Sequence, residues 1–100
     1  MSLTVSLSQG AKADEWRYCI APAYRDHKIY MTPVFTTRAP LGNAESAFAV
    51  ILDESHIHYD DVQCPKSDTE ASSLTMRRHT TSYNEQIGNQ IIGLNWKPKS

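Results

Sequence analysis

The chain has 100 residues, of which 40% are hydrophobic and 21% charged, a composition typical of one globular domain with a single core. Its formal charge of −1 and its scattered basic residues argue against nucleic acid as a partner. No apolar run approaches the roughly 20 residues that span a bilayer and no export signal is recognisable, so we expect a cytoplasmic protein without a membrane partner, or an exported one whose signal has been removed.

The first quarter of the chain has the alternating pattern of β-strands. Residues 3–8 alternate apolar and polar side chains and form either an optional first strand or a loose arm. The segment 15–21 places Trp16, Tyr18 and Ile20 on one face and is rich in residues that favour sheets. We therefore predict a strand over 15–21.

A second β-rich segment, 28–37, follows a polar turn, and the two segments together predict an antiparallel hairpin. Pro33 interrupts the second segment. Because proline cannot donate a ladder hydrogen bond, we expect this strand to lie at an edge or to carry a bulge at that position.

Two helices are predicted. Asn43 is the expected N-cap of the first, which covers 44–55 and presents a broad apolar face to a sheet. The second begins where Ser67 and Glu70 form a capping box, and it ends at Gly88, a residue suited to the left-handed position after a helix. Its narrow stripe is assigned to sheet packing, with a partner surface as the alternative, and consists of Met76, Thr80, Tyr83 and Ile87.

Two further strands are predicted, a short irregular one at 57–64 and a closing one at 89–96. The element order is then β-β-α-β-α-β, with the optional strand in front, and it predicts one α+β domain over residues 1–100. We expect a two-layer sandwich in which both helices pack on one face of a four- to five-stranded, mostly antiparallel or mixed sheet. Residues 1–12 and 97–100 are expected to be loose ends.

Two histidines and several acids cluster in "ESHIHYDD", residues 54–61. Residues two apart on a strand point to the same side, so His56, His58 and Asp60 are the candidate metal ligands. The ordinary interpretation is a polar junction between a helix and a strand, and a pH-sensitive surface is a further alternative. No cofactor is predicted.

Cys19 and Cys64 show neither metal-site nor redox-motif spacing. We expect two reduced, buried thiols that pack as small hydrophobic groups. The alternative is a disulfide that closes a long loop in an oxidising compartment.

The remaining candidate site residues form a ligand or partner surface, namely Trp16, Tyr18, Tyr30, Trp96, Arg77 and Arg78. No nucleophile elbow and no phosphate-binding glycine loop occurs, so no catalytic residue is assigned and an enzyme is the weaker class. The function favoured by the sequence is a small soluble domain that binds a protein partner, or a second copy of itself as a homodimer, through an open sheet face or an edge strand. The alternatives are a small metal-dependent or small-ligand enzyme that uses His56 and His58, and an exported domain with one disulfide.

Overall fold

The computed structural model describes residues 15–40 and 42–98, so the predicted strand at 3–8 lies outside the described residues. In chain order the elements are β1 (Glu15–Arg17), β2 (Ile20–Ala23), the 3-10 turn η1 (Tyr24–Asp26), β3 (Lys28–Met31), β4 (Phe35–Thr37), α2 (Asn43–Glu54), β5 (Lys66–Ser67), α3 (Glu70–Gln86) and β6 (Gln90–Gly93). In the part of the chain that is described, no helix combines the length and the apolar character needed to cross a membrane.

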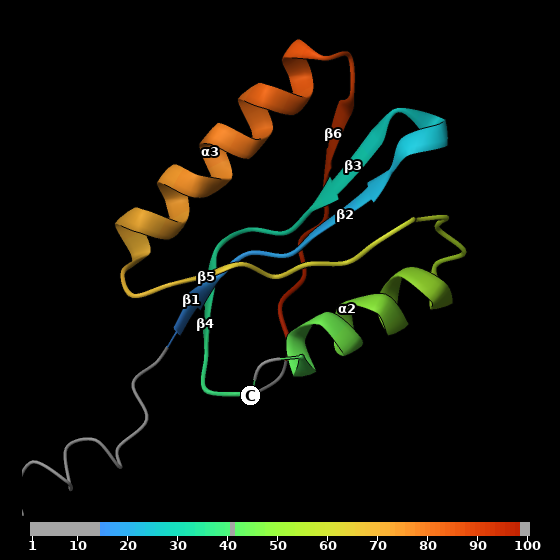
Figure 1. Cartoon of the computed structure of the whole chain (residues 1–100). Helices are drawn as coiled ribbons and strands as arrows, with labels where there is room; N and C mark the ends of the chain where they lie inside the picture. The colour runs from blue at the N-terminus through green and yellow to red at the C-terminus, as the bar shows by residue number, and fades with distance from the viewer. Residues whose placement is uncertain (1–14, 41, 99–100) are drawn as a thin grey trace, which may run out of the picture.

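The strands form two small three-stranded sheets, in the orders β4-β1-β5 and β2-β3-β6 (Figure 1). β2 and β3 form the predicted antiparallel hairpin, and β6 joins β3 in parallel. Because β1 leads into β2 and β3 leads into β4, two continuous runs of chain take part in both sheets. The interruption of the second run falls at residues 32–34 and contains Pro33, which has no N–H for a ladder hydrogen bond.

The two helices lie on opposite faces of the strands (Figure 1). Cys19 packs with Phe48 of α2. The preceding residue, Tyr18, points to the other side and packs, together with Ile29, against Met76 of α3. The α+β class and the element order are confirmed, and the predicted mixed pairing occurs in the sheet β2-β3-β6. Two details differ from the expectation: the strands divide between two three-stranded sheets instead of forming one sheet of four or five strands, and the helices cover opposite faces instead of one. Alternate strand residues point to opposite sides, and here both sides are apolar, so each side needs its own helical cover.

The chain between the helices is less regular than expected. Within the predicted strand 57–64, only Gln63 forms a β-bridge, to Ile20. The regular strand between the helices lies after the predicted range: it is β5, which is two residues long and pairs antiparallel with β1. Since β6 pairs with β3, the segment before α3 and the segment after it belong to different sheets.

Both helices begin at a different cap from the one predicted. Gly42, with a φ of 98°, occupies the N-cap of α2, and Asn43 is the first helical residue. The N-cap of α3 is Thr69, whose Oγ1 accepts a hydrogen bond from the backbone N–H of Ser72 at 3.1 Å. Ser67 does not cap the helix because it is taken up by β5.

The second helix is held by few buried side chains. Ser73 is the one buried residue of α3, and the half-buried side chain of Met76 packs against the core. The helix packs mainly on β1, β5 and β6. Gly88 follows it with a φ of 93°, which confirms the predicted left-handed position.

Candidate functional site

Cys19 and Cys64 are joined by a disulfide in the core, with their Cα atoms 4.0 Å apart. The strand register explains why they meet. Ile20 and Gln63 exchange both backbone hydrogen bonds, at 2.8 and 3.0 Å, so one step along the antiparallel register position 19 lies opposite position 64. The cysteines therefore occupy a non-hydrogen-bonded pair, the type in which Cα atoms come closest.

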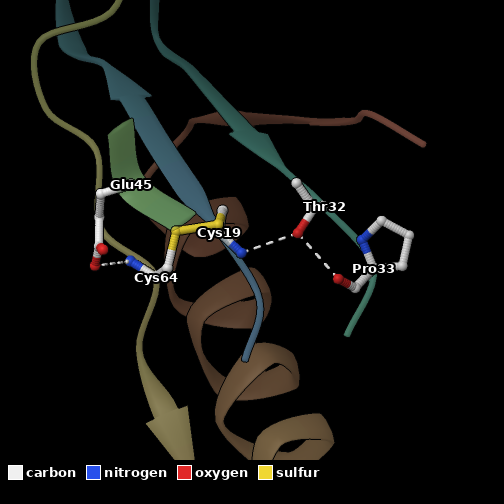
Figure 2. Close-up of a disulfide and its surroundings, with 5 residues drawn as sticks. All are labelled: Cys19, Thr32, Pro33, Glu45 and Cys64. Carbon is white, nitrogen blue, oxygen red and sulfur yellow. Dashed lines mark hydrogen bonds between the residues drawn. A yellow bond between two sulfur atoms is a disulfide. The ribbon is translucent and has the colours of Figure 1, made fainter. Parts of the chain in front are cut away.

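The backbone N–H groups of the two cysteines are each taken by a side chain (Figure 2). Cys19 donates to Oγ1 of Thr32 at 2.9 Å, and Thr32 donates in turn to the carbonyl of Pro33 at 2.9 Å. Cys64 donates to Oε2 of Glu45, on α2, at 3.0 Å. Since both cysteines are at most 2% exposed, the disulfide is a structural cross-link that solvent does not reach.

A cleft of about 360 Å³ lies on the α3 face of the strands, next to the β2–β3 hairpin. Ile20 and Pro22 of β2 and the buried Ile29 of β3 form its apolar strand side. The end of α3 and the residues just after it border the cleft, and Tyr24, Asp61 and Gln63 contribute the remaining lining. The cleft exists because α3 covers mainly β1, β5 and β6 and leaves part of β2 open.

Exposed apolar side chains gather at this cleft. Among the described residues, five large hydrophobic side chains are exposed, and three of them line the cleft: Tyr24 at 61%, Tyr83 at 62% and Ile87 at 55%. The other two, Val50 on α2 and Leu74 near the start of α3, do not line it. Single exposed apolar residues are common on proteins, whereas a cluster at a concave site is typical of a binding surface.

Polar groups at the cleft are held in place by neighbours. The Oδ1 atom of Asp61 accepts a hydrogen bond from Val62 N at 2.8 Å, and its Oδ2 accepts one from Nε2 of Gln63 at 3.1 Å. On the helical side, the side-chain carbonyl of Asn84 accepts from Nδ2 of Asn89 at 3.0 Å. The cleft is thus apolar with a fixed carboxylate and amide groups at its border.

The aromatic residues predicted as one surface lie in different places. Tyr18 is buried in the core that faces α3. Tyr30 and Trp96 pack against the core that faces α2, where the ring of Trp96 stacks on Phe48 with centroids 5.1 Å apart. Trp16 is half-buried on β1. The four rings do not form a single patch.

The two predicted arginines also have separate environments. Arg77 is half-buried, and its Nε donates to the carbonyl of Thr32 at 2.8 Å, which ties α3 to the segment after β3. Arg78 is exposed. Both border a shallow hollow on α3 beside Leu74.

The predicted metal ligands are only partly brought together. His58 Nε2 lies 3.4 Å from Oδ1 of Asp60, and the other oxygen of Asp60 accepts the backbone N–H of Tyr24 at 2.8 Å. His56 is exposed in a left-handed turn, with a φ of 58°. Over residues 15–40 and 42–98, no group of three or more His, Cys, Asp or Glu side chains is placed to hold a metal ion.

Among the described residues, two groups have shifted pKa values, and neither lies in the cleft. The hydrogen bond from Arg17 is the main cause that lowers the pKa of Glu15 below 4.5; burial opposes it, and Lys66, at 3.5 Å, assists. Burial, together with the nearby carboxylate of Asp53, raises the pKa of Tyr59 above 10.0.

Of the cleft residues, Tyr83 and Ile87 belong to the α3 stripe for which the sequence offers a partner surface as the alternative to sheet packing, and Tyr24 is assigned to no site. Tyr83 and Ile87 fall on the same stripe as Met76, and one helical stripe was expected to pack as a unit. Tyr24 lies in the turn η1, where no periodic hydrophobic pattern indicates which side chains are buried. The sequence feature that points to an exposed end of the stripe is the polar character of α3 on either side of it, because so polar a helix does not bury its whole length.

Comparisons with protein-family models, with curated proteins and with solved structures find no match to this chain.

Proposed function

We propose that this chain is a small binding domain whose cleft, beside the β2–β3 hairpin, receives an apolar segment of a partner protein. The observation that supports this function best is the gathering of Tyr24, Tyr83 and Ile87 at one concave site. Leaving three large apolar side chains in water forgoes the free energy of their burial, which a partner would recover.

The proposed binding surface is a restricted form of the open sheet face that the sequence favours. Each face of the strands carries a helix, so neither is open along its whole length. The part that remains open is the surface of β2 at Ile20 and Pro22, because α3 packs mainly on β1, β5 and β6. A second copy of this chain is one partner that would fit the same proposal.

We further propose that the domain works in an oxidising compartment, rather than in the cytoplasm. This is supported by the buried Cys19–Cys64 cross-link, because disulfides persist mainly in secreted and periplasmic proteins. A small domain also gains the most from such a cross-link, since its hydrophobic core is limited.

Selection from a random seven-residue peptide library tests the cleft directly. The oxidised full chain is the bait, and selected peptides are then measured against the double variant Tyr83→Ser/Ile87→Ser. We expect that variant to lose at least tenfold in affinity, about 1.4 kcal/mol, because two apolar walls are removed. The double variant Val50→Ser/Leu74→Ser is the matched control, since it removes two apolar side chains elsewhere that are about half exposed.

Peptides that bind both double variants equally well, or a selection that enriches none, would refute the cleft as the binding surface. Thermal unfolding of both variants establishes that they remain folded, which the exposure of all four side chains favours.

A further inference from the structure

The cleft has one formally charged lining residue, Asp61. Its two carboxylate oxygens accept hydrogen bonds from Val62 N and from Gln63 Nε2, and the side chain remains exposed to solvent at the cleft. In the described part of the chain, Asp61 forms no ion pair. The neighbouring acid is different in this respect, because Asp60 accepts the Tyr24 N–H and lies 3.4 Å from His58.

Two tyrosine rings line the same cleft as this carboxylate. Tyr24 and Tyr83 come from the turn η1 and from α3, and each is more than half exposed. The faces of aromatic rings attract cations, and the attraction increases when the cation loses water on binding. Ile87 and Pro22 supply apolar surface next to them.

We propose that the group recognised by this cleft is a Lys or Arg side chain, presented by an apolar segment of the partner protein. The long aliphatic part of such a side chain packs on Pro22 and Ile87, while its charged end meets Asp61 beside the tyrosines. Charge complementarity carries the assignment, because a negative cleft border disfavours an acidic segment. This inference rests on the proposed function and specifies its partner.

The remaining charges near the cleft leave this preference intact. On η1, Arg25 and Asp26 are adjacent and exposed, and their formal charges cancel. On α3, Glu85 follows Asn84 and adds a second negative charge to that end of the helix. Lys28 is half-buried on β3 and does not line the cleft.

The test compares the selected peptides on the wild-type chain and on the variant Asp61→Asn. Asn keeps an Oδ1 acceptor for the Val62 N–H, and its Nδ2 can donate to Oε1 of a rotated Gln63 amide in place of the bond that Oδ2 accepts, so the local turn is preserved while the charge is removed. We expect the selected peptides to be enriched in Lys or Arg, and we expect Asp61→Asn to weaken them roughly 3- to 10-fold. Replacing the basic residue of a peptide by Gln should not lower its affinity for Asp61→Asn any further, because the charge that this residue contacts is already absent. The affinity of the basic peptides for the wild-type chain should fall as the salt concentration rises.

Asp68→Asn is the control, since Asp68 is an exposed acid before the start of α3, away from the cleft. It should leave the affinity unchanged. Peptides that need Tyr83 and Ile87 but lack basic residues, or that bind Asp61→Asn as tightly as wild type, would overturn the cation assignment and leave the binding function standing. Butylammonium that binds as tightly as the peptides would overturn the assignment to a protein segment. A selection that enriches no cleft-dependent peptide would overturn both.

Discussion

The guanidinium of Arg17 is buried, and within the described residues its one hydrogen-bond partner is the carboxylate of Glu15. The Nε and Nη1 atoms of Arg17 have no partner. Glu15 is different, because about a third of its side chain is exposed and it also lies 3.5 Å from Lys66. This is an ion pair in which one member has lost its water and the other has not, so desolvation of the arginine opposes the attraction.

Replacing Arg17 with Met should leave the free energy of unfolding equal to that of the wild type, or raise it by up to about 2 kcal/mol. Met fills a similar volume and removes two buried donors that have no acceptor. Urea unfolding monitored by circular dichroism measures the change. A clear loss of stability would mean that the pair stabilises the fold despite its burial.

Acid should destabilise the chain partly through Glu15. Its pKa is lowered in the folded state, so its stabilising contribution is present above its ordinary pKa of 4.5 and is lost as the pH falls through the lowered value. In Glu15→Gln this part of the pH dependence should disappear, which gives a flatter melting-temperature profile between neutral pH and about pH 3. Parallel profiles for the two proteins would contradict the assigned shift.

Removing the disulfide should cost roughly 4 kcal/mol, because its loop spans 45 residues and the cross-link restricts the unfolded chain. The double variant Cys19→Ala/Cys64→Ala is compared with the wild type, with and without reductant, by urea unfolding. Reductant should act on the wild type only after denaturant exposes the buried sulfurs, and alkylation with mass measurement detects this. Rapid native-state alkylation would show that the bond is accessible.

Thr69→Ala should destabilise α3 by about 1 kcal/mol, because the side chain that accepts the Ser72 N–H is lost. Thr69→Ser retains a hydroxyl and should stay within a few tenths of a kcal/mol of the wild type. Thermal unfolding of the three proteins checks both expectations. Equal midpoints for the alanine and serine variants would argue against this cap.

Zinc titration of the native chain should give no affinity tighter than millimolar. His58 and Asp60 supply at most two ligands in contact, and strong sites use three or four. Calorimetry measures this, and His56→Ala/His58→Ala serves as the reference. Micromolar binding that the reference loses would restore the metal-dependent enzyme as a candidate function.

Several local features follow from the sequence because short-range physics determines them. Period-two alternation predicts the hairpin of β2 and β3, and the 44–55 apolar pattern predicts α2. Gly88 takes the left-handed position for which its missing Cβ suits it. The helix caps were mistaken by one or two residues because Ser67 and Thr69 both offer a hydroxyl, and only pairing with β1 removes Ser67 from the competition.

Only the tertiary structure decides how these elements face one another. Alternating residues on β2 and β3 are apolar on both sides, and the sequence of one strand does not say which helix covers which side. The register that brings Cys19 opposite Cys64 depends on contacts 45 positions apart. The same holds for the cleft, where Tyr24, Asp61 and Tyr83 meet because α3 packs mainly on β1, β5 and β6 while its last turn lies beside β2, and no local pattern encodes that placement.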